Sequence, residues 1–286
     1  MYFDLLTDQP MLALGITFII SLCVGSFLNV VIHRLPRMMD LEWQAQLTEA
    51  KGEPAEQEAY NLSFPASHCP KCNHRIRWYE NIPLLSYLVL RGKCSQCKTP
   101  ISIRYPLVEL STALIATFGV YHYGLNEIGV AFALLTFFLI SLTVIDLDHQ
   151  LLPDRLTLPL LWLGLLVNSY STFTTLHLAV FGAVAGYMIL WSIYHAFRLL
   201  TGREGMGYGD FKLLAALGAW AGVNQLPVII FLSALIGAVL GILMMALGRH
   251  NREQPMPFGP FLAFAGWVAI LWGDQITNAY HQLLQV

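Results

Sequence analysis

Long apolar stretches alternate with short polar turns along most of the chain. A helix needs about 20 apolar residues to cross a bilayer. Eight stretches approach or exceed this length, and they begin near Met11, Pro106, Glu127, Leu156, Leu176, Phe211, Leu226 and Phe258. The pattern predicts an all-α polytopic membrane protein with about eight transmembrane helices. The stretches from Phe211 and Phe258 are short, so the sequence leaves open whether each spans the bilayer or re-enters it from one side.

One polar segment is too long to be a turn, and it separates the first apolar stretch from the second. It divides the chain into a first transmembrane helix at residues 1–33, a small polar module at residues 34–105 and a membrane domain of about seven helices at residues 106–286. No basic residue precedes the first apolar stretch, which is long enough to span. This arrangement indicates an anchor rather than a cleaved signal peptide.

Composition supports the membrane class, and the basic residues add an orientation. Of the 286 residues, 56% are hydrophobic and 12% are charged, so lipids are expected around most of the chain. The net charge of -2 gives no indication of a nucleic-acid partner. All 16 Lys and Arg residues lie on one side of the eight-helix arrangement. Because basic loops stay in the cytoplasm, the polar module is expected there and both termini on the opposite side.

The polar module contains two Cys-x-x-Cys pairs, separated by 21 residues. The four residues are Cys69, Cys72, Cys94 and Cys97. This spacing is typical of a structural zinc site, in which four thiolates fill every coordination position. Disulfides or free thiols are the alternatives, although the cytoplasm keeps thiols reduced. His68 and His74 flank the first pair and are alternative ligands. The sequence therefore predicts a zinc-stapled cytoplasmic module between the first two helices.

Two acidic residues stand where apolar stretches meet polar turns on the cytoplasmic side. Asp210 belongs to Gly207-Tyr208-Gly209-Asp210, and Asp146 directly follows an almost uninterrupted apolar run. Gly207 and Gly209 permit a close backbone approach, so an extended substrate can lie beside Asp210. Two facing carboxylates can hydrolyse a peptide bond when the ionised one activates water and the protonated one polarises the carbonyl. These features predict a catalytic pair of Asp146 and Asp210.

Other interpretations of the same residues remain open at this point. Acidic side chains at helix ends can simply be solvated at the membrane interface. A transporter or ion channel could use the two acids as a carboxylate relay, with the zinc module as a regulator, but a relay favours acids near the membrane midplane. A scaffold protein could use the zinc module to dock a partner, which would leave the acid among glycines unexplained.

The motifs together resemble a known family. The segment at residues 207–210 matches the Gly-x-Gly-Asp signature of intramembrane-type aspartic proteases. With the acidic cluster at residues 146–154, the segments at residues 25–36 and 81–88 and both cysteine pairs, the chain is similar to the bacterial type IV prepilin peptidases over nearly its whole length.

This resemblance implies a bifunctional enzyme of the bacterial inner membrane whose active site faces the cytoplasm. Residues 106–286 would form the aspartic peptidase domain, with Asp146 and Asp210 as the catalytic acids. The expected substrates are type IV prepilins and pseudopilins of type II secretion, whose basic leader is removed. S-adenosylmethionine would then methylate the new amino terminus. For the methyl-donor site the resemblance offers only Gly92 and Glu109 as candidates, and the oligomeric state remains open.

Overall fold

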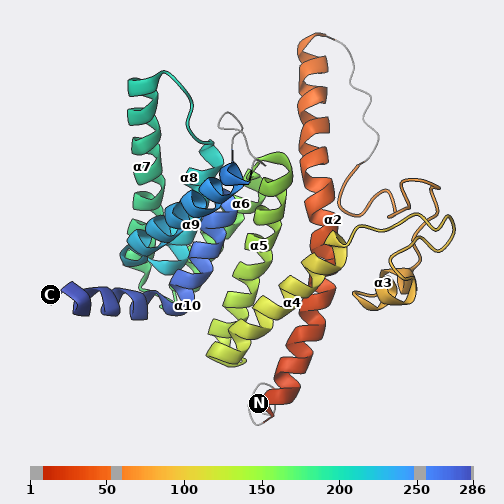
Figure 1. The fold of residues 1–286 in the computed structure, drawn as a ribbon, viewed down its shortest axis with the longest axis horizontal. Helices are drawn as coiled ribbons and strands as arrows, with labels where there is room; N and C mark the ends of the chain where they lie inside the picture. The colour runs from red at the N-terminus through yellow and green to blue at the C-terminus, as the bar shows by residue number, and fades with distance from the viewer. Residues whose placement is uncertain (1–8, 53–59, 248–255, 285–286) are drawn as a thin grey trace. The chain divides into compact units, whose positions relative to one another are not determined.

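The computed structural model describes residues 9–52, 60–247 and 256–284. Every apolar stretch identified in the sequence is a helix (Figure 1). The long helices are α2 (Pro10–Ala50), α4 (Arg104–Tyr123), α5 (Glu127–His149), α6 (Asp154–Asn168), α7 (Leu176–Thr201), α8 (Tyr208–Ala221), α9 (Leu226–Ala246) and α10 (Gly259–Leu284). The short elements are η1 (Trp78–Asn81), α3 (Leu85–Val89) and η2 (Val223–Gln225). Within the described ranges there are isolated β-bridges but no strand, which confirms the all-α class.

Four helical segments of the described chain are long and apolar enough to cross a membrane. They are α2, α5, α7 and residues Val223–Ala246, which include α9. Helices α6 and α8 have only 15 and 14 residues. At 1.5 Å per residue each is about 21–23 Å long, shorter than a hydrocarbon core of about 30 Å. The structure therefore gives four clear spans where the sequence predicts about eight.

The two stretches that are short in the sequence behave differently. The stretch from Phe211 forms the short helix α8, as its length indicates. The stretch from Phe258 becomes the 26-residue α10, because the helix continues through polar residues such as Asp274 beyond the apolar run. Apolar length alone therefore underestimates the length of the last helix.

The chain forms two compact units, residues 1–141 and 142–286, and α5 contributes to both. In the first unit α2 packs closely on α4, since a Cβ atom at Gly25 would lie only 2.8 Å from the Cα atom of Glu109. Helix α2 also passes through Pro36 and continues to Ala50. The boundary expected at residue 33 between the first helix and the module therefore falls inside one continuous helix.

Backbone carbonyls tie the polar module to these two helices. The Arg34 guanidinium on α2 donates a hydrogen bond of 3.0 Å to the Asn61 carbonyl, in the part of the module that follows α2. The Asn29 amide, also on α2, donates to the Tyr105 carbonyl at the start of α4. Both ends of the module are thus held at α2.

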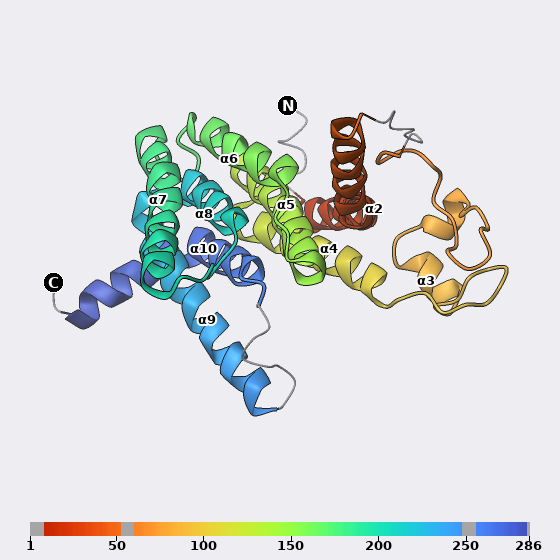
Figure 2. The ribbon, with the colours of Figure 1, turned by 90° about the horizontal axis from the view of Figure 1, so that it is seen from above.

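In the second unit α8 is packed against α6, α7 and α10 (Figure 2). Its residues 213–221 are all buried. Helix α7 approaches so closely that a Cβ atom at Gly182 would lie 2.2 Å from the Gly218 carbonyl oxygen. Small residues at a helix contact allow this backbone-to-backbone packing, which is common in membrane proteins.

Polar side chains on α6 fix the far end of α8. The buried Asn168 amide donates hydrogen bonds of 2.8 and 2.9 Å to the carbonyls of Ala219 and Trp220. In return, the Trp220 indole N–H donates to the Leu160 carbonyl at 2.8 Å. The two bonds from Asn168 satisfy carbonyls that the end of α8 leaves open, and all three bonds hold α8 in place with Asp210 in its first turn.

Candidate active site and metal centre

Asp146 lies near the C-terminal end of α5 and is buried. The residue is only 5% exposed. One carboxylate oxygen, Oδ2, accepts a hydrogen bond of 2.9 Å from the backbone N–H of Gly259, the first residue of α10. An acidic group that is buried in this way needs a partner, and here the start of another helix supplies it.

Asp210 lies in the first turn of α8 and is 8% exposed. Gly207 precedes this turn as the N-cap residue, and its backbone N–H faces the Asp210 carboxylate. Leu152 lies against both Gly209, beside Asp210, and Gly259, whose N–H binds Asp146, so the structure brings the two acids into one site. They come from segments that lie 64 positions apart in the sequence.

Leu152 lies against the starts of α8 and α10. A Cβ atom at Gly209 would lie 2.7 Å from the Leu152 Cβ atom, and one at Gly259 would lie 3.1 Å from Leu152 Cδ2. A Cβ atom at Gly259 would also lie 2.7 Å from Asp146 Oδ2. The absence of side chains at both glycines therefore lets α8 and α10 begin close to the carboxylates.

Gly207 is less crowded than these two glycines. The nearest atom to its Cβ position is Asp210 Oδ2, at 3.8 Å, which is an ordinary contact. Its φ angle of -81° is one that any residue adopts. The fold itself therefore does not require glycine at this position, whereas it does at Gly209 and Gly259.

The electrostatics of the pair follow from two helix starts. The N-terminus of a helix carries partial positive charge and free N–H groups, which favour a carboxylate. Helices α8 and α10 present such ends to Asp210 and Asp146, respectively. Burial and mutual repulsion of the two carboxylates oppose a second negative charge on the pair.

The other acids of the cluster lie elsewhere. Asp148 is exposed, and so is Asp154 at the start of α6. Asp154 accepts hydrogen bonds of 2.6 and 2.8 Å from the Lys212 ammonium group on α8. This ion pair joins α6 to α8 at the end of α8 that carries Asp210. Of the three acids in the cluster, Asp146 is the buried one.

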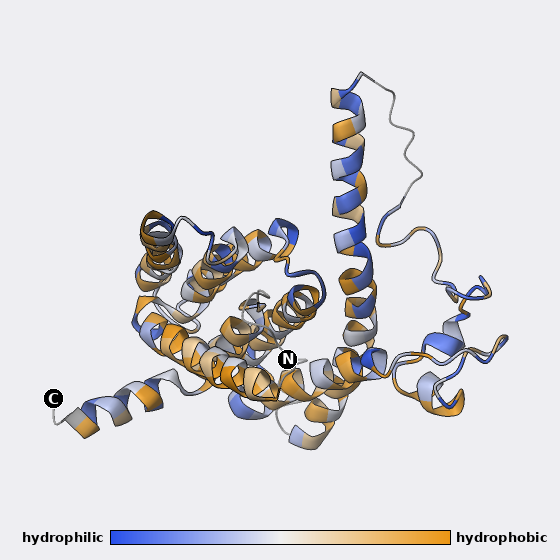
Figure 3. Ribbon diagram, turned by 45° about the horizontal axis from the view of Figure 1, so that its top comes forward, coloured by the Kyte–Doolittle hydropathy of each residue, from blue (hydrophilic) through white to orange (hydrophobic). Residues whose placement is uncertain are grey.

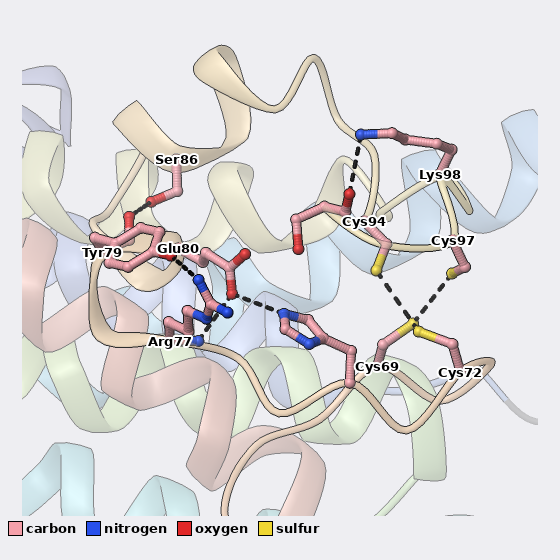
Figure 4. Close-up of polar contacts among 11 residues, drawn as sticks. Cys69, Cys72, Arg77, Tyr79, Glu80, Ser86, Cys94, Cys97 and Lys98 are labelled. Atoms are coloured by element: carbon pink, nitrogen blue, oxygen red, sulfur yellow. Dashed lines mark hydrogen bonds and ion pairs between the residues drawn. The ribbon is translucent and has the colours of Figure 1, made fainter.

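The four cysteines of the polar module converge on one point (Figure 4). Their sulfur atoms all lie within 4.8 Å of one another, with 3.7 Å between Cys69 and Cys97 and 3.9 Å between Cys72 and Cys94. A disulfide needs about 2.0 Å between its sulfurs. Four sulfurs around a tetrahedral Zn²⁺ at about 2.3 Å are about 3.8 Å apart. The geometry therefore fits a metal and excludes the disulfides that the sequence leaves open.

Each cysteine pair sits on a turn of the same construction. Cys69 N–H donates to the His74 carbonyl, and Cys94 N–H donates to the Thr99 carbonyl. The residues four positions after the first cysteine of each pair, Asn73 and Lys98, have φ angles of 56° and 57°. The two halves of the metal site thus repeat one backbone conformation.

Glu80 connects these two halves. Its Oε2 atom accepts a hydrogen bond of 2.9 Å from the Arg77 backbone N–H and lies 3.1 Å from Nε2 of His74 (Figure 4). Bonds from the Arg77 backbone, the Ser95 side chain and His74 lower the pKa of the Glu80 carboxyl to about 2. His74 is therefore engaged with Glu80, and His68 contacts the Ala66 carbonyl, so the cysteines alone form the metal site in the described chain.

The two candidates for a methyl-donor site lie at opposite ends of α3. Glu109 on α4 is buried, and its Oε2 atom accepts a hydrogen bond of 2.9 Å from the Leu84 N–H just before α3. Gly92 lies just after α3, where its N–H donates to the Tyr87 carbonyl. Its φ of +65° and the Tyr87 ring beside it both favour glycine. Each candidate thus has a structural partner on or next to α3.

Gly259 and Leu152 are the site residues that the sequence analysis misses. Gly259 stands in Phe258-Gly259-Pro260, at the start of the last apolar stretch. A Gly-Pro pair there marks a helix start, but no pattern in the sequence connects it with Asp146. The contact depends on chain segments 113 positions apart.

Two protein-family models match the chain. Residues 19–123 match the model of the bacterial peptidase A24 N-terminal domain, and residues 133–242 match that of the type IV leader peptidase family. The first match includes the four cysteines, Gly92 and Glu109, whereas the second includes Asp146 and Asp210.

Curated relatives are similar over nearly the whole chain, and each is named prepilin leader peptidase/N-methyltransferase. The relative from Pseudomonas aeruginosa is 55% identical over 98% of this chain and 97% of its own. Those from Aeromonas hydrophila and Dichelobacter nodosus are 55% and 51% identical, covering 97% and 96% of this chain and 97% and 98% of their own. No solved structure matches the chain. The chain belongs to the type IV leader peptidase family.

Proposed function

We propose that the protein cleaves the leader peptide from type IV prepilins and pseudopilins and then methylates the new amino terminus. The observation that carries the proposal is the buried pair of Asp146 and Asp210, each of which faces a backbone N–H at the start of a helix. Family membership favours this function over the transporter or channel that the sequence leaves open. The relatives' names favour both activities in one chain.

The two carboxyls supply an acid and a base for peptide hydrolysis. The ionised carboxyl takes a proton from a water molecule, whose oxygen attacks the scissile carbonyl carbon. The protonated carboxyl donates its proton to the carbonyl oxygen. When the resulting tetrahedral intermediate collapses, the C–N bond breaks and the amine leaves with a proton from the pair. Asp146 and Asp210 are therefore the proposed catalytic acids.

The glycines beside Asp210 provide room for the substrate. Gly207 is exposed, and its Cβ position is uncrowded in the free enzyme. An extended prepilin segment can therefore lie along the Gly207 backbone toward Asp210, because glycine has no side chain to keep another backbone away. Gly209 has a different role in the proposal, because its missing side chain accommodates Leu152.

The metal and the methyl donor belong to the first unit. Zinc is the metal that four cysteine thiolates in this geometry suit, and it would hold the two halves of the module together. S-adenosylmethionine supplies the methyl group when bound. The buried Glu109 carboxylate suits its positive charge, and Gly92 lies at the other end of α3, so we place the donor site near this helix.

The orientation of the site follows from the charges. The one-sided distribution of 16 Lys and Arg residues favours a cytoplasmic position for the module and the catalytic pair, in a bacterial inner membrane. In this arrangement α4, α6, α8 and α10 complete about eight membrane segments, of which the short α6 and α8 cross a thin or protein-filled part of the membrane.

Single substitutions in the purified enzyme test the proposal. Asp146→Asn or Asp210→Asn should lower cleavage of a prepilin by at least about a thousandfold, and the double variant should be scarcely worse, since the two groups act as one unit. Mass spectrometry measures both loss of the leader and gain of a methyl group. The Asp210→Asn enzyme should still methylate a peptide that is already cleaved.

Asp148→Asn is the matched control, because Asp148 lies on the same helix but is exposed. It should retain most of the cleavage activity. Additive partial losses in the two single variants would contradict a catalytic pair. Loss of methylation in a well-folded Asp210→Asn enzyme would contradict two separate sites.

A further inference from the structure

The polar module carries a strong positive charge. Residues 61–104 contain seven Lys and Arg residues but a single acidic residue, Glu80. Six of the seven basic side chains are exposed: Lys71, Arg75, Arg77, Arg91, Lys93 and Lys98. A Zn²⁺ ion with four thiolates has a net charge of about -2, which leaves the module positive. This local positive charge contrasts with the net charge of -2 of the whole chain.

Large apolar side chains are exposed on the same module. Trp78 on η1 is 81% exposed, and Leu85, Leu88 and Val89 on α3 are 60, 70 and 80% exposed. We call these four residues the α3 face. In a water-soluble domain, contiguous apolar residues with this exposure mark a surface for a protein or a membrane.

The position of α3 in the first unit favours a membrane. Figure 1 shows α3 level with the N-terminal half of α2, and the C-terminal half of α2 extends away in the other direction. The N-terminal half of α2 is the apolar part that can cross a bilayer, whereas its C-terminal half is largely hydrophilic (Figure 3). Helix α3 thus lies on the membrane side of the module, and the Arg34 and Asn29 side chains of α2 tie the module to that helix.

We propose that the α3 face inserts into the interfacial region of the bilayer and that exposed basic residues of the same module bind anionic lipid headgroups. Apolar side chains with flanking Lys and Arg are the combination that holds peripheral segments at an anionic membrane surface. An acidic protein would satisfy the charge, but it would have to compete with a bilayer that the membrane-crossing half of α2 keeps permanently within reach. The occupant is therefore lipid.

Photocrosslinking of the full-length protein in lipid nanodiscs tests this inference. The photoreactive residue p-benzoylphenylalanine replaces Trp78 or Leu88, and the matched control position is Trp43, which is 60% exposed on the hydrophilic half of α2. After illumination, mass spectrometry of the digested protein detects lipid attached to each position. The two bilayers compared are phosphatidylcholine alone and phosphatidylcholine mixed with phosphatidylglycerol.

Both α3-face positions should give lipid adducts at a yield at least about fivefold above that of the Trp43 position in the mixed bilayer. The yield should fall several-fold in pure phosphatidylcholine, and also when NaCl is raised from about 0.05 M to about 0.5 M, because salt screens the headgroup charges. Adducts with another protein chain in place of lipid would overturn the inference. Equal yields at all three positions, or no dependence on anionic lipid, would overturn it as well.

The inference does not depend on the peptidase activity, because the readout is lipid attachment. If the Asp146 and Asp210 variants kept their cleavage activity, the inference about lipid binding would be unaffected. A failure of lipid attachment would leave the proposed chemistry standing.

Discussion

The catalytic proposal depends on hydrogen bonds from single backbone N–H groups to the two carboxylates. Asp146 accepts the N–H of Gly259, and Asp210 faces the N–H of Gly207. Each hydrogen bond from a helix start stabilises a negative charge, while burial and the neighbouring acid oppose it. A pair in this balance holds one proton over a range of pH, and its titration belongs to both residues together. Cleavage should therefore have a bell-shaped pH dependence.

At the residue scale, two glycine substitutions distinguish a residue that positions a catalytic carboxylate from a residue that the substrate approaches. Gly259→Ala places a methyl group against Asp146 Oδ2, so the carboxylate must shift. We expect kcat for prepilin cleavage to fall by at least about tenfold, with a loss of stability of about 1–3 kcal/mol from overpacking. Steady-state kinetics and thermal unfolding in detergent measure the two effects.

Gly207→Ala is the matched comparison, because its methyl group would meet Asp210 Oδ2 only at 3.8 Å. This enzyme should unfold at the temperature of the parent and show a raised KM with kcat little changed. A large loss of stability in Gly207→Ala would contradict the assignment of this position to substrate approach.

At the scale of elements, the short helix α8 is fixed by its neighbours rather than by its own length. Helices this short are marginal alone, but α8 is buried on all sides and anchored by Asn168 at its C-terminal end. Asp154 and Lys212 join it to α6 at the other end. The same principle applies to the polar module, where short turns depend on the cysteine cluster and on Glu80.

The contact between α7 and α8 leads to a prediction about packing. Gly218→Ala adds a methyl group that overlaps sterically with the Gly182 carbonyl oxygen, so α8 must move away from α7. We expect a lower unfolding temperature and at least about tenfold slower cleavage, as overpacking at this contact costs about 1–3 kcal/mol. Gly15→Ala on α2 is the control, since no atom lies within 4 Å of its Cβ position. Equal behaviour of the two variants would refute the proposed packing role.

The polar module leads to a prediction about metal retention. The lowered pKa of Glu80, about 2, means that ionised Glu80 stabilises the module above its ordinary pKa of 4.5, and that this contribution is lost as pH falls toward 2. Glu80→Gln removes it at neutral pH. The variant should therefore release zinc to a chelator several-fold faster than the parent, whose zinc content should be about one per chain.

The ratio of the two release rates should stay constant between pH 7 and about pH 5.5, since Glu80 remains ionised throughout that range. A ratio that changes with pH across this interval would show that a different group is responsible. Glu49→Gln, on the hydrophilic half of α2, is a suitable control for the loss of one acidic charge.

At the scale of the whole molecule, orientation in the membrane decides which compartment supplies the substrate. The basic residues predict cytoplasmic placement for the module and for the segment before α8. Reporter fusions after Asn126 and Asn224 should therefore be active outside the cytoplasm, whereas fusions after Lys51 and Arg203 should be active inside it. Enzymatic reporters of the two compartments, fused at each position, measure this directly. A Lys51 fusion on the outside would overturn the cytoplasmic assignment and would put the reduced state of the cysteines in doubt.

The sequence by itself determined the helical class and the approximate positions of the helices, and it predicted Asp146 and Asp210 as the catalytic acids. Apolar runs of sufficient length must become helices in a membrane, because backbone groups have no other partners there. Cysteine spacing likewise predicted a metal site, since four thiolates at that spacing have few alternatives. These conclusions depend on residues that are close together in the chain, so local sequence patterns are sufficient to predict them.

Only the tertiary structure decided what depends on distant segments. It placed Gly259 on Asp146 and Leu152 between two helix starts, and it enclosed the short α8 within its neighbours. It also excluded disulfides by the sulfur distances and extended α2 to Ala50 without a break at residue 33. Local patterns carry no information about which backbone N–H meets which carboxylate, because that choice is made by packing between helices and not by the residues on either side.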